Sequence, residues 1–516
     1  MGNSHIEDNK RIAKNTIMLY IRMLFGMFVS FYTSRVILNA LGVADYGIQN
    51  VVGGFVSMFS LISMSLSSSV GRFLTFELGK GDYESLKKVF STSVLIHIGL
   101  AIIVFVLSET VGVWFVNNKM VIPENRLYAA NWVFQASILS FVFGLLSVPY
   151  NALIVAHERM SAFAYIGILE IVLKLVIVLF VAYCPYELDK LIIYSLLLTG
   201  SGILMRFIYV SYCRRNFNES ELNFHFDKHC LKEMGAFAGW NFIGCSALLL
   251  KNQGVDILLN LYFGPIVNAA RGIASTVNGA ISSFSSNFMT ALNPQITKSY
   301  AADDREFTLS LVERGSRFSF FIMFMFALPI FIEADFVLTI WLKQYPEHTV
   351  NFVRLILALS LCDIISNTLI TLQSATGKIR NYQLAVGGML LLNFPLSYIC
   401  LKLNCPPESV LFVAIIVSVF CMILRLLFLR RMVNLSIRRF VYNVCVKIII
   451  VVLASSVLPI VIHSNMDYGW LRLIVVGATS ILSSSVMILL LGCTTGERNF
   501  IVKKALTLLN SRFAAR

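Results

Sequence analysis

Residues 41–82 read LGVADYGIQNVVGGFVSMFSLISMSLSSSVGRFLTFELGKGD, and residues 263–304 read FGPIVNAARGIASTVNGAISSFSSNFMTALNPQITKSYAADD. At an offset of 219, AHERMSAF at 156–163 also resembles ATGKIRNY at 375–382. Either match alone is weak evidence, because its sequence identity is low. Two matches in the same order at nearly the same offset indicate a duplicated chain. The first pair of stretches, aligned at an offset of 222, shares five residues: Gly42 with Gly264, Ser60 with Ser282, Ser63 with Ser285, Thr75 with Thr297, and Asp82 with Asp304.

The sequence around this repeat is strongly apolar. Of its 516 residues, 57% are hydrophobic and 14% are charged, whereas about 25% of a soluble domain is charged. A bilayer-spanning helix needs roughly 20 apolar residues. Apolar windows bounded by charged and turn residues therefore predict an all-α integral membrane protein of about fourteen transmembrane helices. The predicted spans are 15–40, 46–76, 89–116, 127–155, 161–184, 190–213, 236–262, 266–297, 317–340, 351–376, 381–403, 408–429, 440–463 and 469–492.

The duplicated unit contains six of these spans. An even number of spans per copy makes the two copies parallel, so we expect two six-helix lobes related by a pseudo-two-fold axis along the membrane normal, followed by two C-terminal helices. The predicted organisation is an N-terminal lobe (1–213), a cytoplasmic connecting loop (214–235), a C-terminal lobe (236–430), the last two spans (431–496) and a basic cytoplasmic tail (497–516).

The formal net charge of +14 is distributed unevenly among the loops. Lysines and arginines fall mainly on every second loop, in a ratio of roughly five to one, as expected when cytoplasmic loops carry the positive charge. This pattern predicts an even number of spans with both termini in the cytoplasm. It also accounts for the basic composition without a nucleic-acid partner.

Polar side chains spaced three or four residues apart follow several of the predicted spans, and such spacing places them on one helix face. Ionisable groups inside the membrane usually face a cavity or a partner. We therefore expect a polar cavity between the lobes, with Asp256 and Asp363 as candidate ion-coupling sites. The candidate substrate-binding residues are Arg22, Arg35, Ser60, Ser63, Asn241, Lys251, Asn252, Arg271, Asn278 and Ser282.

Several polar residues of the predicted spans also have a simpler structural explanation. Serine rows let helices approach closely and bond to their own backbone. Arginines near the ends of spans, such as Arg35 and Arg271, can extend to the membrane surface. Glu170 and Lys174 lie four residues apart, a spacing that favours a structural ion pair.

Motifs for enzymatic chemistry are absent from the sequence. It contains no GxxxxGK[ST] phosphate-binding loop, no HExxH metal motif and no GxSxG nucleophile motif. The ten cysteines show no metal-binding spacing. We therefore expect neither an enzyme nor a cofactor nor a bound metal.

The opening NTIMLYIRMLFGMFVSFYTSRVILNALGVADYGIQNVVGG, the serine-rich span after it and the FxxELGKGD turn at 73–82 resemble the bacterial polysaccharide flippases. These O-antigen and capsule-type proteins belong to the multidrug/oligosaccharidyl-lipid/polysaccharide exporter superfamily. The similarity covers most of the chain and is strongest over 10–175. The number of spans and the six-plus-six repeat also agree with this family.

The resemblance implies that the protein moves an undecaprenyl-pyrophosphate-linked oligosaccharide from the inner to the outer leaflet of the bacterial cytoplasmic membrane. It further implies alternating access around a cavity whose cations hold the pyrophosphate or acidic sugars. The implied partners are this lipid-linked substrate, membrane lipids, and polysaccharide polymerase or assembly proteins. The implied role is in surface polysaccharide or lipopolysaccharide biosynthesis.

Three alternatives stay open at this point. A multidrug/cation antiporter of the same superfamily typically has an acidic residue in its first span, where this chain has Arg22 and Arg35. A flippase for the peptidoglycan lipid precursor shares the span count and cavity arginines. A scaffold for polysaccharide assembly without transport activity has little use for buried charges such as Lys251 and Asp256.

Overall fold

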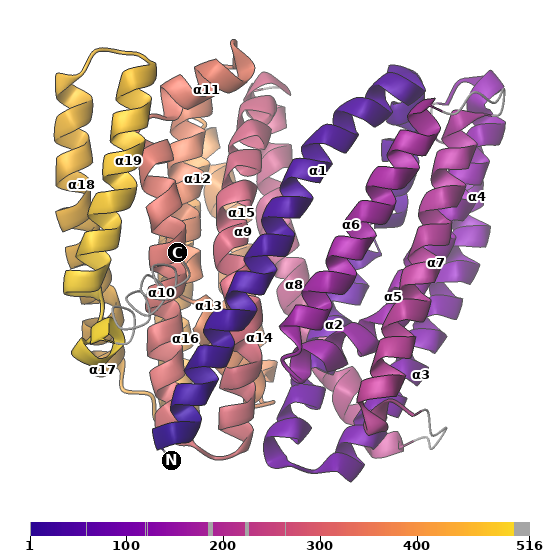
Figure 1. Ribbon diagram of the computed structural model, residues 1–516. Coiled ribbons are helices and arrows are strands. Elements are labelled where there is room, and N and C mark those ends of the chain that lie inside the picture. Colours follow the sequence, from indigo (N-terminus) through magenta and orange to yellow (C-terminus); the bar gives the residue numbers. More distant parts are fainter. Residues whose placement is uncertain are drawn as a thin grey trace, which may run out of the picture. The chain divides into compact units, whose positions relative to one another are not determined.

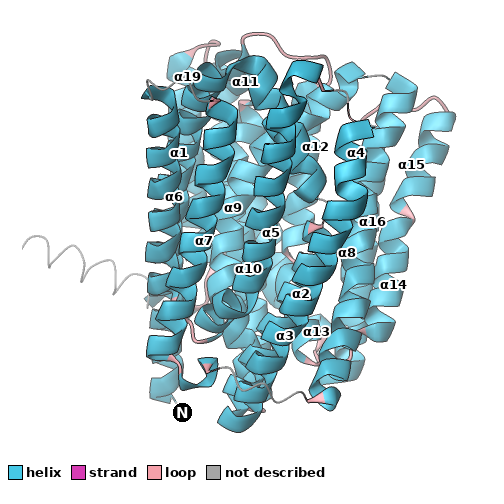
Figure 2. Cartoon of the chain, turned by 90° about the vertical axis from the view of Figure 1, so that its right-hand side faces the viewer, coloured by secondary structure: helices cyan, strands magenta, loops and turns pink. Residues whose placement is uncertain are grey.

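The computed structural model describes residues 2–57, 59–118, 120, 122–183, 189–221, 227–263 and 265–499. The side chains of residues 2–10, and of scattered positions within 13–61 and 249–269, lie outside this description. The described residues form helices joined by turns and contain no strand, as Figure 2 shows. This confirms the all-α membrane fold predicted from the sequence.

Most helices of the first half of the chain are long, and the colours of Figure 1 follow them along the sequence. They are α1 (Gly2–Ser57), α2 (Ser60–Lys80), α3 (Tyr83–Leu107), α4 (Val113–Asn118), α5 (Leu127–Ala156), α6 (Met160–Tyr183) and α7 (Lys190–Asn216). The second half contains α8 (Lys228–Phe263), α9 (Pro265–Ala301), α10 (Arg305–Ile332), α11 (Ala334–Leu342), α12 (Thr349–Ile364), α13 (Asn367–Ala375), α14 (Arg380–Leu391), α15 (Asn393–Lys402), α16 (Ser409–Val433), α17 (Ile437–Phe440), α18 (Lys447–Asn465) and α19 (Trp470–Met487).

Among the described residues, eleven helical segments are long and apolar enough to cross a membrane. They match the predicted spans except 46–76, 236–262 and 266–297. Residues 236–262 lie in α8 and 266–297 in α9, whereas 46–76 is divided between the end of α1 and α2. All three stretches carry the polar side chains noted in the sequence. The ninth span differs most from the prediction, because it runs from Arg305 to Ile332 rather than from 317 to 340. The first turns of α10 are too polar to fall inside an apolar window.

The backbone repeats the same turn at the two offsets found in the sequence. Gly81 has a φ of 75° and Asp303, 222 residues later, has a φ of 60°. The amide of Asp82 donates to the carbonyl of Glu77 at 3.2 Å, and the amide of Asp304 donates to the carbonyl of Ser299 at 3.1 Å. Both are Schellman endings of a helix, with a left-handed residue after the last turn.

A second turn repeats at the offset of 219. Glu158 has a φ of 58° and Gly377 a φ of 74°. The amide of Glu158 donates to the carbonyl of Val155 at 2.9 Å, and the amide of Gly377 donates to the carbonyl of Ser374 at 3.1 Å. The duplication is therefore present in the backbone hydrogen bonds, although few side chains are shared.

The chain divides into two compact units, and two helices belong to both of them. The first unit contains residues 1–246 and 290–304, and the second contains 247–289 and 305–516. Helix α8 thus begins in the first unit and ends in the second, whereas α9 begins in the second and ends in the first. Pro294 lies inside α9, four residues after Thr290, where the first unit resumes.

In the first unit, α5 packs against α2, α3 and α7, and α1 packs against α6. A cluster of ionic contacts around Glu158 holds the end of α9 in this unit. The side chain of Glu158 is fully buried and forms ion pairs at 2.7 Å with Arg11 Nε and Lys298 Nζ. Gln295 donates to the same carboxylate, and Asn15 Nδ2 donates to the Glu158 carbonyl at 3.1 Å. The Glu158 turn therefore links α1, α9 and the connection between α5 and α6.

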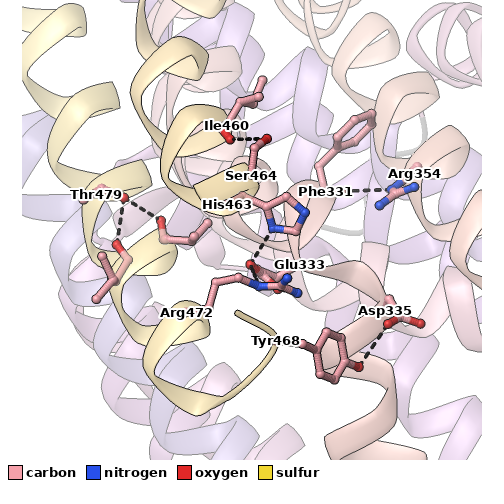
Figure 3. A network of polar contacts seen from close by, with 12 residues as sticks. Phe331, Glu333, Asp335, Arg354, Ile460, His463, Ser464, Tyr468, Arg472 and Thr479 are labelled. Carbon is pink, nitrogen blue, oxygen red and sulfur yellow. Dashed lines mark hydrogen bonds and ion pairs between the residues drawn. The ribbon is translucent and has the colours of Figure 1, made fainter. Parts of the chain in front are cut away.

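In the second unit, α16 packs against α12, α14 and α15, and the last two long helices, α18 and α19, lie side by side (Figure 1). Figure 3 shows how these two helices are attached to the end of α10. The buried carboxylate of Glu333 accepts from His463 Nδ1 at 2.8 Å and from Arg472 Nη2 at 3.0 Å. Beside this contact, Tyr468 donates to Asp335 at 3.0 Å.

Candidate functional site

The second unit contains a polar cavity of about 720 Å³ between α8, α9, α12 and α16. The polar faces of α8, α9 and α12 all point toward this cavity, and α16 contributes Leu411. Four charged side chains line it: Lys251, Asp256, Arg271 and Asp363. The wall is completed by four amide or hydroxyl side chains, Asn268, Ser275, Asn278 and Ser360, and by apolar residues that include Leu248, Ile356, Leu359 and Leu411.

The four charges of this cavity form two ion pairs. Arg271 Nη1 donates to Asp256 Oδ1. Lys251 Nζ lies 3.5 Å from Asp363 Oδ2, and Ser418 Oγ donates to the other oxygen of Asp363. Because each cation has a carboxylate beside it, the four groups together carry no net charge. This pairing lowers the cost of placing them among membrane helices.

The partners of each pair differ in exposure. The side chains of Lys251 and Arg271 are 4% and 10% exposed, whereas those of Asp363 and Asp256 are 42% and 41% exposed. The cations therefore lie within the wall, and the carboxylates form the charged part of its accessible surface.

The first unit contains a smaller cavity, of about 410 Å³, and no charged side chain is among the described residues that line it. Its polar groups come from the second part of α1 and from α2, α5 and α7. They are the amide of Gln49 and the hydroxyls of Ser63, Ser137, Ser140, Ser195 and Thr199, next to apolar residues that include Val56, Phe141, Gly144 and Leu145.

The two cavities lie at equivalent places in the two repeats. Gln49 and Val56 line the first, and the residues 222 positions later, Arg271 and Asn278, line the second. Six residues of α5 line the first cavity, and a shift of 219 places four of them, Ser137, Ser140, Phe141 and Gly144, on residues that line the second cavity: Ile356, Leu359, Ser360 and Asp363. One ancestral site has therefore become two cavities of different chemistry.

Of the residues selected from the sequence, Lys251, Asp256, Arg271, Asn278 and Asp363 meet in the second-unit cavity. Ser63 lines the first-unit cavity.

The other selected residues whose side chains are described line neither of these two cavities. Arg22 packs over the ring of Phe163 at 4.6 Å, and a Cβ added at Gly167 would lie 2.6 Å from its Cδ. Arg35 and Ser60 are exposed.

Asn241 Nδ2 donates to the carbonyl of Ser65 at 3.5 Å, and Ser282 Oγ donates to the carbonyl of Gly279 in its own helix at 3.4 Å. The side chain of Asn252 lies outside the described residues.

Several residues of the second cavity did not stand out in the sequence. Ser360 and Ser418 lie in apolar runs of α12 and α16, where a single serine gives no pattern. Asn268 precedes Arg271 by three residues on α9, and this spacing could have included it in the polar face. The ion pair predicted between Glu170 and Lys174 is present, at 2.7 Å, on the exposed surface of α6.

Solved structures with the same fold define the class of protein. MATE in complex with MaD3S aligns with a TM-score of 0.69 and 12% identity, over 82% of this chain and 96% of that one. A MOP superfamily transporter from Pyrococcus furiosus Vc1 (DSM3638) aligns with a TM-score of 0.68 and 12% identity, over the same shares. The MATE transporter ClbM in complex with Rb⁺ aligns with a TM-score of 0.66 and 14% identity, over 84% and 97%. The chain thus has the two-lobed helical fold of these transporters.

The chain belongs to the polysaccharide biosynthesis protein family, whose model matches residues 12–300. A curated relative is the uncharacterized membrane protein EpsK of Bacillus subtilis (strain 168), which is 21% identical over 327 residues. That match covers 62% of this chain and 63% of the relative's length. The protein is therefore a multi-pass membrane protein of the polysaccharide biosynthesis family.

Proposed function

We propose that this protein carries an undecaprenyl-pyrophosphate-linked oligosaccharide from the inner to the outer leaflet of the bacterial cytoplasmic membrane. The observation that carries this proposal is the second-unit cavity, which combines two ion pairs with four amide or hydroxyl side chains among membrane helices. Buried charge in a membrane protein marks substrate and ion pathways. Amides and hydroxyls suit the hydroxyl groups of sugars, and the family has a role in polysaccharide biosynthesis.

The proposed mechanism is alternating access. The substrate shifts the balance between inward-open and outward-open states by binding them with different affinity. In this scheme both termini lie in the cytoplasm, and polysaccharide polymerase or assembly proteins receive the exported unit. Asp256 and Asp363 are the proposed sites of a coupled cation or proton, which would compete there with Arg271 and Lys251.

The test is the accumulation of lipid-linked oligosaccharide in a strain that lacks the gene, with the leaflet of the oligosaccharide assigned. We expect repeat units to accumulate on the cytoplasmic face. The wild-type protein and the control Lys174→Leu, which removes the cation of an exposed ion pair, should both restore export. Arg271→Leu should not, because it removes a cavity cation. Normal surface polysaccharide without accumulation in the deletion strain would refute the proposal.

A multidrug or cation antiporter is the second candidate, and the exposure of the cavity carboxylates favours it. Asp256 and Asp363 present negative charge to the cavity, which suits a cationic drug. This function predicts that the deletion strain becomes sensitive to cationic dyes while its surface polysaccharide stays normal. A flippase predicts that the deletion strain loses surface polysaccharide while its tolerance of cationic dyes stays normal.

A further inference from the structure

We propose that the second-unit cavity binds the sugar part of the substrate through its carboxylates, prefers neutral and amino-bearing sugars, and excludes the pyrophosphate. This inference rests on the proposed function and gives the cavity a ligand chemistry. It departs from the expectation, implied by the family resemblance, that the cavity cations hold the pyrophosphate or acidic sugars.

The first argument is the order of charges in the cavity wall. A phosphate approaching Lys251 or Arg271 first meets Asp363 or Asp256, because the carboxylates are about 40% exposed and the cations are at most 10% exposed. Binding an anion would require breaking an existing ion pair and leaving a carboxylate uncompensated inside the membrane region, which is costly. A hydroxyl or an ammonium group meets the carboxylates directly and leaves both pairs intact.

The second argument is the hydrogen-bonding capacity that the wall leaves unused. An ionised carboxylate accepts about four hydrogen bonds. Asp363 uses one oxygen for Ser418 and the other for Lys251 at 3.5 Å, so lone pairs remain on the exposed part of the group. The exposed oxygens of the carboxylates can therefore accept further hydrogen bonds, and sugar hydroxyls or an amino group supply donors whereas a fully ionised phosphate supplies none.

The third argument is that the carboxylates are held in place before a ligand arrives. Asp363 is fixed from two sides by residues of α8 and α16, and Asp256 is fixed by Arg271 of α9. Fixed acceptors select ligands by geometry because little rotamer freedom is lost on binding. The cations thus act as positioning residues for the acids.

The experiment uses purified full-length protein in lipid nanodiscs and ligand-observed saturation-transfer NMR. The probes are three methyl glycosides of different charge: glucosaminide (cationic), N-acetylglucosaminide (neutral) and glucuronide (anionic). Inorganic pyrophosphate is the competitor. We expect clear saturation transfer to the first two probes, at least about fivefold weaker binding of the glucuronide, and no displacement by pyrophosphate.

Variants connect this preference to the carboxylates. Asp363→Asn and Asp256→Asn should each weaken glucosaminide binding roughly tenfold and narrow its advantage over the glucuronide. If a single variant misfolds because it leaves a buried cation, the double variant Lys251→Leu with Asp363→Leu removes the whole pair and should show the same loss of preference. Glu170→Gln, which neutralises the acid of the exposed pair on α6, is the matched control and should bind as the wild type does.

Stronger binding of the glucuronide or pyrophosphate than of the other probes would overturn the inference, as would a preference that survives in all the cavity variants. These outcomes are separable from failure of the proposed function. If the deletion strain accumulates lipid-linked oligosaccharide but the purified protein prefers anions, the inference fails and the flippase stands. If glycosides bind as expected but no lipid-linked oligosaccharide accumulates, the proposed flippase function is refuted and the preference of the cavity for neutral and amino-bearing sugars is kept.

Discussion

The cavity of the first unit and the cavity of the second unit occupy the same place in the two repeats but differ in charge. Where the first has Gln49 and Gly144, the second has Arg271 and Asp363. Duplication therefore fixed the position of each cavity through helix packing, while the lining side chains diverged. The first cavity therefore offers uncharged polar groups, and the second offers charged ones.

Ion pairs at the helix ends of the two units also keep their position while their side chains differ. Arg126 of the first unit binds Asp189, with 2.7 Å between Nη1 and Oδ2. In the second unit, His348, which precedes α12, binds Glu408, which precedes α16, with 2.7 Å between Nδ1 and Oε1. Each pair links the start of one helix to the start of another. The repeat thus keeps the connection while the chemical groups change.

The largest expected effect concerns the pair that distinguishes the second cavity. Asp363→Leu should destabilise the protein by about 3 kcal/mol, because it leaves the buried cation of Lys251 without a partner. Lys251→Leu should cost clearly less, since the carboxylate that remains is 42% exposed. Thermal unfolding in detergent measures both, and the double variant should recover much of the loss. Equal losses in the two single variants would contradict the difference in exposure.

A smaller effect is expected from exchanging a turn between the repeats. Glu158→Gly gives the first unit the residue that the second has at Gly377. The variant should lose about 2 kcal/mol, because Arg11 and Lys298 lose their carboxylate, while relief of the left-handed backbone at Glu158 offsets part of the cost. Limited proteolysis at the end of α9 and thermal unfolding are the measurements. Unchanged stability would show that the contacts of Glu158 contribute little.

A still smaller effect should appear in the dependence of stability on pH. Partial burial opposes ionisation of Asp189 and Glu408, but Arg126 lowers the pKa of Asp189, and Asn351 with His348 lowers the pKa of Glu408. A carboxyl whose folded pKa is lowered stabilises the fold above its unfolded pKa and loses this contribution as the pH falls through the folded pKa. We therefore expect stability to decrease below roughly pH 4.

Variants assign this acid-dependent loss to one unit or the other. Arg126→Gln should reduce the part that comes from Asp189, and His348→Gln the part that comes from Glu408. The measurement is thermal unfolding from pH 6 to pH 3. Curves of unchanged slope in both variants would exclude these pairs as its source.

The smallest effect is expected inside the first cavity. No atom lies within 4 Å of a Cβ built at Gly144. Gly144→Ala should therefore fit without a clash and stabilise α5 by up to about 1 kcal/mol through helix propensity. Thermal unfolding and export of the lipid-linked oligosaccharide check the prediction. A marked loss of export would show that the cargo approaches the backbone at this glycine.

The sequence was sufficient to predict the helices and the duplication, because apolar windows and repeated turn residues are local signals. It also selected Lys251, Asp256, Arg271 and Asp363, since charges in apolar segments stand out. Their pairing was not predictable, because Lys251 and Asp363 are 112 residues apart and no motif links them. Which side chain of each pair faces the cavity depends on packing between helices, and that information is absent from a single sequence.

Helices α8 and α9 each contribute residues to both units. Pro294 lacks an amide hydrogen and so cannot donate to the carbonyl of Thr290, the residue at which α9 enters the first unit. This turn of α9 thus has one hydrogen bond fewer than a regular α-helix, so bending α9 here costs less than bending it at a turn with a complete set of hydrogen bonds.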